Sequence, residues 1–519
     1  MADTAGLRRS YLAFNAALGD LYSDDLLELA SASDKPDFDD TAFFDAAGMV
    51  YNAGGFDASQ LNTPEARRLI AETLKQLDTA IASGISYEVP ETVRYALENN
   101  AFVFSGFKAF HTLREVGLAL VTDKGDIKPF EQFRQDVEAV NSRYNHNYLY
   151  AEYNHAVGAS LMASRWQQIE KDGDRYDLQY RTAQDDRVRE DHAILHGTTL
   201  PPSDPFWSLY LPPNGWNCRC TAVQVRKGKY PQSDPALSML RGNNCTENAK
   251  QQMFRFNPGK ELKLFPPKHP YFKAPPEVKK VVEQLSEEQQ RERRIAEIVA
   301  ELPENHTTEQ KQAIAAHCLE LEKALGITKG KPMSVDEADK QSANPNYSKG
   351  RAYQINCQTC APAYVLRLLG FNVVAKANTP GSLSEYLSRQ RSFEAWTNAD
   401  GSKPSPSLTY DWMVGKGYKL MNKKRYAEFF NECCKETGVY ILTIGWKGGG
   451  GHATILQRFA DGSISYIEPQ IYDNKSSRRS IDELCNYGAA KPIKTRGVLR
   501  VDNLLFNTKF ASIFEEAAK

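Results

Sequence analysis

Two cysteines spaced three residues apart open the apolar segment "INCQTCAPAYVLRLLG", residues 355–370. A Cys-x-x-Cys pair can bind zinc, cycle between thiol and disulfide, or supply a nucleophile. Cys433 and Cys434 offer no second zinc pair, because adjacent side chains diverge on a helix. The antiparallel pattern that follows also disfavours a thioredoxin-like redox site. We therefore interpret Cys357 or Cys360 as a thiol nucleophile.

The position of the helix start decides which thiol is activated, because unpaired N–H groups at a helix N-terminus favour a thiolate. Asn356 is a suitable N-cap residue and would place Cys357 in the first turn. Pro362 lacks an N–H and suits only a first turn, which predicts that the regular helix begins near Thr359 and that Cys360 comes first. The residues alone leave both placements open.

A base and an acid follow about a hundred residues later. His452 in "KGGGGHATILQRF" is the single histidine downstream of the two cysteines, at the point where a glycine-rich loop meets a predicted strand. Glu468 in "SYIEPQ" ends the next predicted strand. Neighbouring antiparallel strands would bring Glu468 beside His452, where a carboxylate orients the imidazole and stabilises its cation. The predicted order is Cys, His, acid.

A second cluster lies in "DHAILHG" and "NCRCTAVQV". Cys218 and Cys220 would point to one face of a strand, and His192 and His196 would share a helix face. Such a set could bind zinc, but its spacing matches no standard zinc finger. We favour two small buried cysteines and a hydrogen-bonded core histidine, since cysteine is among the most buried residues. We therefore predict no cofactor, with zinc as the alternative.

The elements around these residues predict a multidomain chain. Apolar spacing of three and four residues predicts helices between residues 40 and 170, with Thr63 as a cap before Pro64. The stretch from Tyr180 is rich in Pro, Gly and aromatic residues and suits a small loop-rich α+β module. The apolar runs "GVYILTIGW" and "HATILQRF" predict an α+β C-terminal domain with an antiparallel sheet. The predicted division is 1–140, 141–228, 229–340 and 341–519.

The composition excludes several classes of function. The 519 residues include 64 Lys plus Arg and 65 Asp plus Glu, so no global field draws the chain to nucleic acid or anionic lipid. No apolar run approaches the roughly 20 residues of a membrane span. Nine cysteines form no dense disulfide framework, and the opening residues show no secretory signal pattern. We expect a protein made in the cytoplasm, with no membrane partner and no specific nucleic-acid partner.

The segments "DDRVREDHAILHG", "DPFW" and "LPPNGWNCRC" stand in the order found in the head-morphogenesis domain of Mu-like bacteriophages, the F-type minor head protein. The resemblance covers roughly residues 40–225. It implies a minor capsid component in the virion, in contact with portal and capsid proteins. Some relatives carry Cys-x-x-Cys where this chain has "RVREDH", so that only His192 remains of that pair here.

"INCQTC", "GGGGHAT" and "YIEPQ" together resemble the papain-fold toxin family, whose members are predicted glutamine deamidases. The resemblance covers roughly residues 340–505 and implies a papain-like fold. It places the nucleophile on Cys357, after Asn356 of the Asn-Cys pair, with His452 as the base. Glu468 stands where the family usually has Asp, and Gln470 falls on a family Gln that supports the oxyanion or the histidine.

Together these resemblances predict a phage or prophage minor head protein with a papain-like thiol domain that deamidates glutamine in a target protein, for example a host protein. Two alternatives remain. The thiol domain could be a capsid maturation cysteine protease, or an inactive domain in a purely structural virion protein. A Cys-His-Glu set attacks a side-chain carboxamide or a main-chain amide by the same chemistry, so these residues leave the substrate open.

Overall fold

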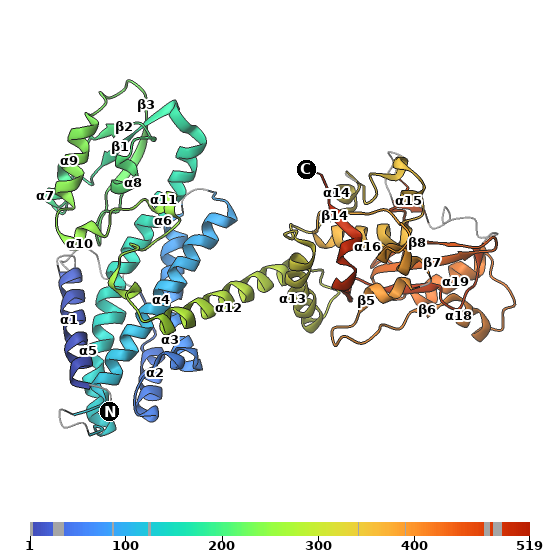
Figure 1. Ribbon diagram of the computed structural model, residues 1–519, viewed down its shortest axis with the longest axis horizontal. Helices are drawn as coiled ribbons and strands as arrows, with labels where there is room; N and C mark the ends of the chain where they lie inside the picture. The colour runs from blue at the N-terminus through green and yellow to red at the C-terminus, as the bar shows by residue number, and fades with distance from the viewer. Residues whose placement is uncertain are drawn as a thin grey trace. The chain divides into compact units, whose positions relative to one another are not determined.

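The computed structural model describes residues 4–23, 36–85, 88–122, 126–340, 342–389, 391–471, 478–480 and 490–518. The chain forms two compact units, residues 1–290 and residues 291–519 (Figure 1). The predicted division into four parts is finer than this and stays a prediction. The boundary expected near residue 340 lies within the second unit, where Asp339 accepts a hydrogen bond from Tyr364 at 2.8 Å.

Helices make up most of the first unit, as the sequence predicted. The hydroxyl of Thr63 accepts the N–H of Ala66 and Pro64 occupies the first position of α3, which confirms the predicted cap. The helices are α1 (Thr4–Ser23), α2 (Asp40–Ala53), α3 (Pro64–Gly84), α4 (Glu91–Ala119), α5 (Phe130–Asn141), α6 (Leu149–Asp172), α7 (Glu190–Ala193), α8 (Phe206–Tyr210), α9 (Pro235–Cys245), α10 (Ala249–Gln252) and α11 (Pro258–Glu261). Helix α12 (Pro276–Glu301) contains the boundary between the units.

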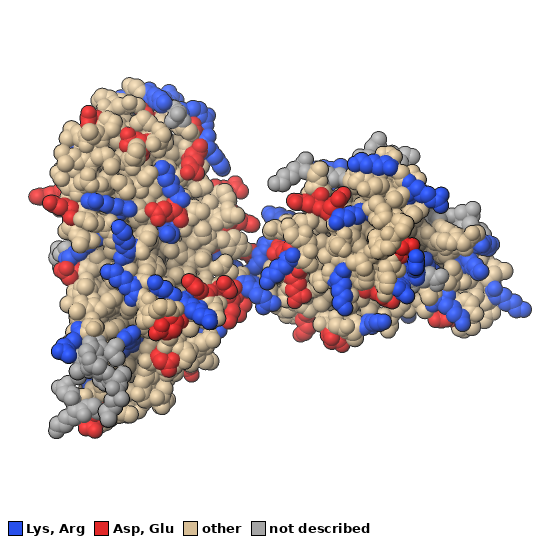
Figure 2. All heavy atoms as spheres, in the orientation of Figure 1, with Lys and Arg blue, Asp and Glu red and all other residues tan. Residues whose placement is uncertain are grey.

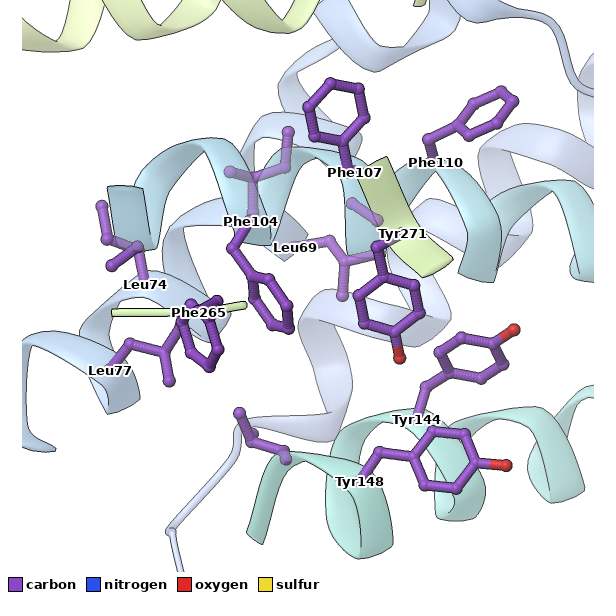
Figure 3. Close-up of a cluster of buried hydrophobic side chains, with 14 of the residues drawn as sticks. Leu69, Leu74, Leu77, Phe104, Phe107, Phe110, Tyr144, Tyr148, Phe265 and Tyr271 are labelled. Carbon is purple, nitrogen blue, oxygen red and sulfur yellow. The ribbon is translucent and has the colours of Figure 1, made fainter. Parts of the chain in front are cut away.

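The core of the first unit is aromatic (Figure 3). Phe104 of α4 stacks on Phe265 with ring centroids 3.7 Å apart. This core also encloses an ion pair between Lys108 and Glu152, whose carboxylate accepts a further hydrogen bond from Tyr22. Burial lowers the pKa of Lys108, and Glu152 opposes that shift. A buried pair of this kind stays charged only because each group compensates the other.

A small antiparallel sheet follows the long helices of this unit, as the sequence predicted. Its strands are β1 (Tyr176–Arg181), β2 (Thr199–Leu200) and β3 (Thr221–Arg226), in the order β2-β1-β3. Phe206, Trp207 and Tyr210 of α8 are fully buried in the core beside this sheet. The sheet and helices α7 to α9 lie together at one end of the long helices (Figure 1).

The second unit is built on an antiparallel sheet in the order β10-β9-β8-β7-β12-β6, with β11 paired to β7. The strands of this unit are β4 (Val373–Ala375), β5 (Trp396–Thr397), β6 (Ser407–Leu408), β7 (Gly438–Trp446), β8 (Gly451–Arg458), β9 (Ile464–Ile467), β10 (Arg478–Ser480), β11 (Ala490–Lys491), β12 (Gly497–Arg500), β13 (Leu505–Phe506) and β14 (Phe514–Glu516). Its helices are α13 (Thr308–Leu325), α14 (Val335–Lys340), α15 (Arg351–Gln354), α16 (Cys357–Leu369), α17 (Leu383–Ser388), α18 (Thr409–Gly415) and α19 (Lys423–Cys433). The antiparallel pairing of β7, β8 and β9 confirms the prediction for these segments.

Both faces of this sheet are covered. Alternate residues of β7 point to opposite sides, so Ile441 belongs to the core that contains α16, whereas Leu442 belongs to the core that contains α18 and α19. This explains why the predicted strand is a nearly continuous apolar run. Gly370 ends α16 with a φ of 114°, a left-handed conformation that glycine adopts readily at a helix C-terminus. The sheet and α16 therefore form one rigid scaffold for side chains at their ends.

The surface carries charges of both signs. Lys, Arg, Asp and Glu side chains are interspersed over the face shown in Figure 2, in keeping with a formal net charge of −1. Among the described helices, none is long and apolar enough to cross a membrane.

Candidate active site and metal-ligand cluster

Cys357 is the first residue of α16. The carbonyl of Asn356 accepts the N–H of Thr359 at 2.8 Å and that of Cys360 at 3.0 Å, so the first turn is tightened by a 3₁₀-type bond. Pro362 lies inside the helix. The prediction that Pro362 delays the regular helix to Thr359 is therefore wrong, because the tightened turn begins the helix two residues earlier.

Asn356 occupies the N-cap position, but its side chain makes no capping hydrogen bond, which corrects the predicted role. The fully buried amide instead donates to Asn344 Oδ1 at 3.2 Å and to the carbonyl of Lys376 at 3.1 Å. Its oxygen accepts from Cys360 Sγ at 3.2 Å and from Gln470 Nε2 at 3.3 Å. The start of α16 is thereby tied to two loops and to the segment after β9.

The structure brings His452 and Glu468 together at the ends of neighbouring strands. His452 is the second residue of β8, and Glu468 directly follows β9, which pairs with β8 at Ile455 and Ile467. His452 Nε2 lies 2.7 Å from Glu468 Oε2. The imidazole is 16% exposed and the carboxylate 3%. Nδ1 is then the ring nitrogen left to serve a reacting group.

Both oxygens of Glu468 have further donors. The hydroxyl of Tyr466 donates to Oε2, and the main-chain N–H of Gln470 donates to Oε1 at 3.0 Å. Gln470 thus supports the acid through its main-chain N–H, and its side-chain amide donates to Asn356 Oδ1 at 3.3 Å. The sequence reasoning missed Tyr466, although its position two residues before Glu468 on a strand places both on one side.

Cys357 and His452 act on each other electrostatically and shift each other's pKa, whereas Cys360 Sγ donates to Asn356 Oδ1 at 3.2 Å. Burial disfavours the Cys357 thiolate, but the hydrogen bond and charge of His452 and the N–H of Ala453 outweigh it and lower the pKa of Cys357. Burial likewise opposes the imidazolium, yet Cys357 and Glu468 raise the pKa of His452 to about 10. Burial raises the pKa of Cys360 well above its usual value. The two shifts together favour the thiolate–imidazolium form of the pair.

The three side chains line one cavity of about 650 Å³. Its other lining residues are mostly polar or aromatic: Gln354, Gln358, Asn378, Ser388, Trp446, Tyr466, Gln470 and Arg496, with Ile355, Ile471, Gly450 and Gly451. A thiolate at a helix N-terminus beside an imidazolium can attack a carbonyl carbon, and nearby N–H groups can stabilise the oxyanion that forms. The sequence reasoning also missed Arg496, which no motif near the cysteines or the histidine indicates.

The second cluster also comes together, in the first unit. Cys218 Sγ lies 3.6 Å and Cys220 Sγ 3.7 Å from His192 Nδ1, and all three residues are buried. Both cysteines precede β3 rather than lying on it, so the prediction of a shared strand face is wrong. His196 is separate, because α7 ends at Ala193 and His196 Nδ1 accepts the N–H of Thr182.

The distances in this cluster fit zinc. Zinc–sulfur bonds of about 2.3 Å and zinc–nitrogen bonds of about 2.0 Å at a tetrahedral angle give a sulfur–nitrogen separation of about 3.6 Å. A hydrogen bond from Cys220 lowers the pKa of Cys218 well below its usual value, which suits a thiolate ligand. Within the described residues the ligand group has three members, and His192 Nε2 is buried without a hydrogen-bond partner. A fourth ligand would have to come from solvent or substrate.

Residues 127–223 match the family described as Phage Mu protein F like protein. This segment runs from α5 to β3 and includes His192, Cys218 and Cys220. The chain is 29% identical over 196 residues to the putative capsid assembly protein F of Escherichia phage Mu, covering 37% of this chain and 41% of that protein. It is 36% identical over 80 residues to the Mu-like prophage FluMu F protein of Haemophilus influenzae, covering 14% and 19%.

The chain thus spans less than half the length of these two relatives. No solved structure matches this chain. The cavity with Cys357 lies outside the segment that matches the Mu F family, so its chemistry has to be argued from its own geometry.

The lowered pKa of Cys357 predicts its alkylation profile. Its thiolate should persist below pH 8.5, the usual pKa of a thiol, and iodoacetamide should alkylate Cys357 at neutral pH faster than it alkylates Cys360. In a His452→Ala variant burial dominates, so the alkylation profile should move to higher pH. Peptide mapping by mass spectrometry across pH 5 to pH 10 measures both rates. A Cys357 profile that is the same with and without His452 contradicts this electrostatic account.

Proposed function

We propose that the first unit serves phage head morphogenesis, as a virion component that contacts capsid and portal proteins. The observation that supports this is the Mu F match over residues 127–223, together with the capsid assembly name of the phage Mu relative. A rigid helical core with an interspersed surface charge is compatible with binding to other proteins. The Mu F relationship alone carries this proposal.

Complementation tests the morphogenesis role. A phage that lacks this chain should form no normal DNA-filled heads, and the wild-type chain supplied in trans should restore them. A Cys357→Ala chain should restore them equally, because the thiol site lies in the other unit. Electron microscopy and protein gels of purified particles measure the outcome. Normal heads without the chain would contradict the role, and head proteins left uncleaved with Cys357→Ala would favour the maturation protease.

We further propose that the second unit is a papain-like thiol amidohydrolase that deamidates glutamine. The observation that supports it is the Cys357–His452–Glu468 constellation, with a lowered pKa at the sulfur and a raised pKa at the imidazole. Glutamine as the substrate comes from the resemblance of the three motifs to papain-fold toxins. The lining residues of the cavity include Gln358, Asn378 and Ser388, whose side chains could hydrogen-bond to a carboxamide.

In the first step the thiolate of Cys357 attacks the carboxamide carbon, and a carbon–sulfur bond forms as the carbonyl oxygen becomes an oxyanion. The N–H groups in the first turn of α16 favour that negative charge. The tetrahedral intermediate collapses, the carbon–nitrogen bond breaks, and the imidazolium of His452 gives its proton to the leaving nitrogen. Ammonia leaves and a thioester remains on Cys357.

In the second step neutral His452 takes a proton from water, and the hydroxide attacks the thioester carbon. The carbon–sulfur bond breaks, glutamate is released, and the thiolate and imidazolium are restored. Glu468 stays ionised throughout, since its pKa is lowered: His452, Tyr466 and the N–H of Gln470 outweigh the opposing effect of burial. Its role is to hold the ring and to stabilise the cation.

Matched cysteine variants test the hydrolase. Cys357→Ala should abolish deamidation, whereas Cys360→Ser should retain most of it, because Cys360 Sγ faces Asn356 and not His452. Glu468→Gln should lower kcat by about 10²- to 10⁴-fold through a misoriented imidazole. Ammonia release and mass spectrometry of glutamine peptides measure the reaction. If Cys357→Ala and Cys360→Ser lose deamidation to the same extent, or if both retain it, the assignment of the nucleophile to Cys357 is contradicted.

A second function is favoured by the geometry of His192, Cys218 and Cys220, and we propose that they bind zinc through two thiolates and one imidazole. A bound zinc would hold α7 against the segment before β3, in addition to the hydrogen bond from Arg189 to the carbonyl of Trp216. The proposed role of the zinc is to stabilise the fold. The fully buried histidine and the sulfur–nitrogen separations support it.

Metal analysis tests the zinc proposal. The full chain purified without chelator should contain stoichiometric zinc, and Cys218→Ser or His192→Ala should lose it. Cys245→Ser is the matched control, because Cys245 is also a buried cysteine but lies outside the ligand group. Elemental analysis gives the content, and thermal melting with and without chelator gives the stabilisation. A wild-type chain that takes up no zinc at micromolar free metal would contradict the proposal.

A further inference from the structure

A buried arginine shares the cavity of the thiol site. Arg496 directly precedes β12, is 5% exposed and lines the same cavity as Cys357 and His452. It reaches this place from a strand separated from β8 by β7. The hydrolysis steps above use no part of its side chain.

The guanidinium of Arg496 has few partners. Nη1 donates to Ser392 Oγ at 3.5 Å, and Nε is buried without a partner. No acidic side chain pairs with Arg496 within the described part of the chain. Arg500, four residues later, is by contrast paired with Asp502 and Glu436. The two arginines of one segment therefore differ in that only Arg496 keeps donors available for another molecule.

The fold holds the Arg496 side chain close to His452. A Cβ atom on Gly451 would lie 3.3 Å from Arg496 Nη2 and 2.5 Å from the carbonyl of Ile444. Glycine at position 451 therefore leaves the room in which the guanidinium lies against the start of β8, one residue before His452. The guanidinium thus lies at the wall of the cavity beside the strand that carries His452.

A buried guanidinium without a paired anion is costly, because burial removes its hydration. Burial lowers the pKa of Arg496, and the charge of Cys357 opposes that shift. Among the described residues, the side-chain hydrogen bond of the guanidinium goes to Ser392 and not to Cys357, so the thiolate does not take up its donors. The cavity thus contains a positive charge that no acidic side chain of the described residues pairs.

We propose that Arg496 binds a carboxylate of the substrate beside the amide that Cys357 attacks, and so makes the thiol site selective for acidic substrates. This rests on the proposed hydrolase function. A guanidinium matches a carboxylate through parallel N–H donors, whereas a neutral substrate would leave the arginine desolvated and unpaired. The carboxylate belongs to an acidic residue next to the target glutamine or to the main-chain terminus of glutamine itself.

Two alkylating reagents test the charge without a known substrate. Iodoacetate and iodoacetamide both react by attack of the Cys357 thiolate on a methylene carbon, with formation of a carbon–sulfur bond and loss of iodide. They differ in the negative charge of iodoacetate. The ratio of their rates at Cys357 cancels the fraction of thiolate, so it reports attraction of the anion by the cavity. Peptide mapping of the full chain at neutral pH measures both rates.

The ratio of iodoacetate to iodoacetamide rates should fall by about three- to tenfold in Arg496→Gln. Arg496→Lys should retain most of the ratio, because it keeps the charge. Arg425→Gln is the matched control: Arg425 lies on α19, away from the cavity lining, and its loss should leave the ratio unchanged. A ratio that is equal in the wild type and in Arg496→Gln would overturn the proposal.

The same data separate this proposal from the hydrolase proposal. If iodoacetamide alkylates Cys357 with the pH profile of an ordinary thiol, the hydrolase proposal fails, whatever the ratio shows. If Cys357 is activated but the ratio of iodoacetate to iodoacetamide rates is the same in the wild type and in Arg496→Gln, the selectivity proposal alone fails. Deamidation of free glutamine and of peptides with Glu or Lys beside glutamine then identifies the source of the carboxylate. In Arg496→Gln, KM should rise for the preferred acidic substrate and hardly change for the Lys peptide.

Discussion

The side chain of Asn356 is the interaction on which the thiol site depends. It is fully buried and joins the first turn of α16 to Gln470 after β9, to Asn344 and to the carbonyl of Lys376. A buried amide that lost these partners would leave several groups unsatisfied. Cys357, which comes from the helix, and His452 and Glu468, which come from the sheet side, are therefore held in one register through the buried amide of Asn356.

The thiol site also depends on a balance at Cys357 between burial, which raises the pKa of the thiol, and the charge of His452, which lowers it. Burial alone would make Cys357 a neutral thiol, as it does for Cys360 three residues later. His452 reverses this at one sulfur only, because Glu468 holds its ring toward that position. The two cysteines of this helix thus differ in their neighbours, since His452 lowers the pKa of Cys357 whereas Cys360 Sγ donates to Asn356 Oδ1.

Much of this arrangement follows from local pattern, and the rest does not. The sequence pattern was enough to predict that His452 and Glu468 meet. One lies at the start of a strand and the other at the end of the next antiparallel strand, so both lie at the same end of the pair. Pro362 suggested the wrong helix start, because a tertiary network around Asn356 overrides local helix propensity. Arg496 was missed because it reaches the cavity from β12, and no short motif encodes a contact across three strands. The papain-like assignment and the four-part division remain predictions.

The site also joins contacts of very different sequence separation. His452 and Glu468 are sixteen residues apart and meet within a single pair of adjacent strands, so their pairing requires the closure of only a short loop. Cys357 joins them across almost a hundred residues, which requires α16 to pack against the sheet. A chain in which this packing is lost lacks the neighbours that lower the pKa of Cys357. The character of this thiol therefore depends on a contact between distant segments of the chain.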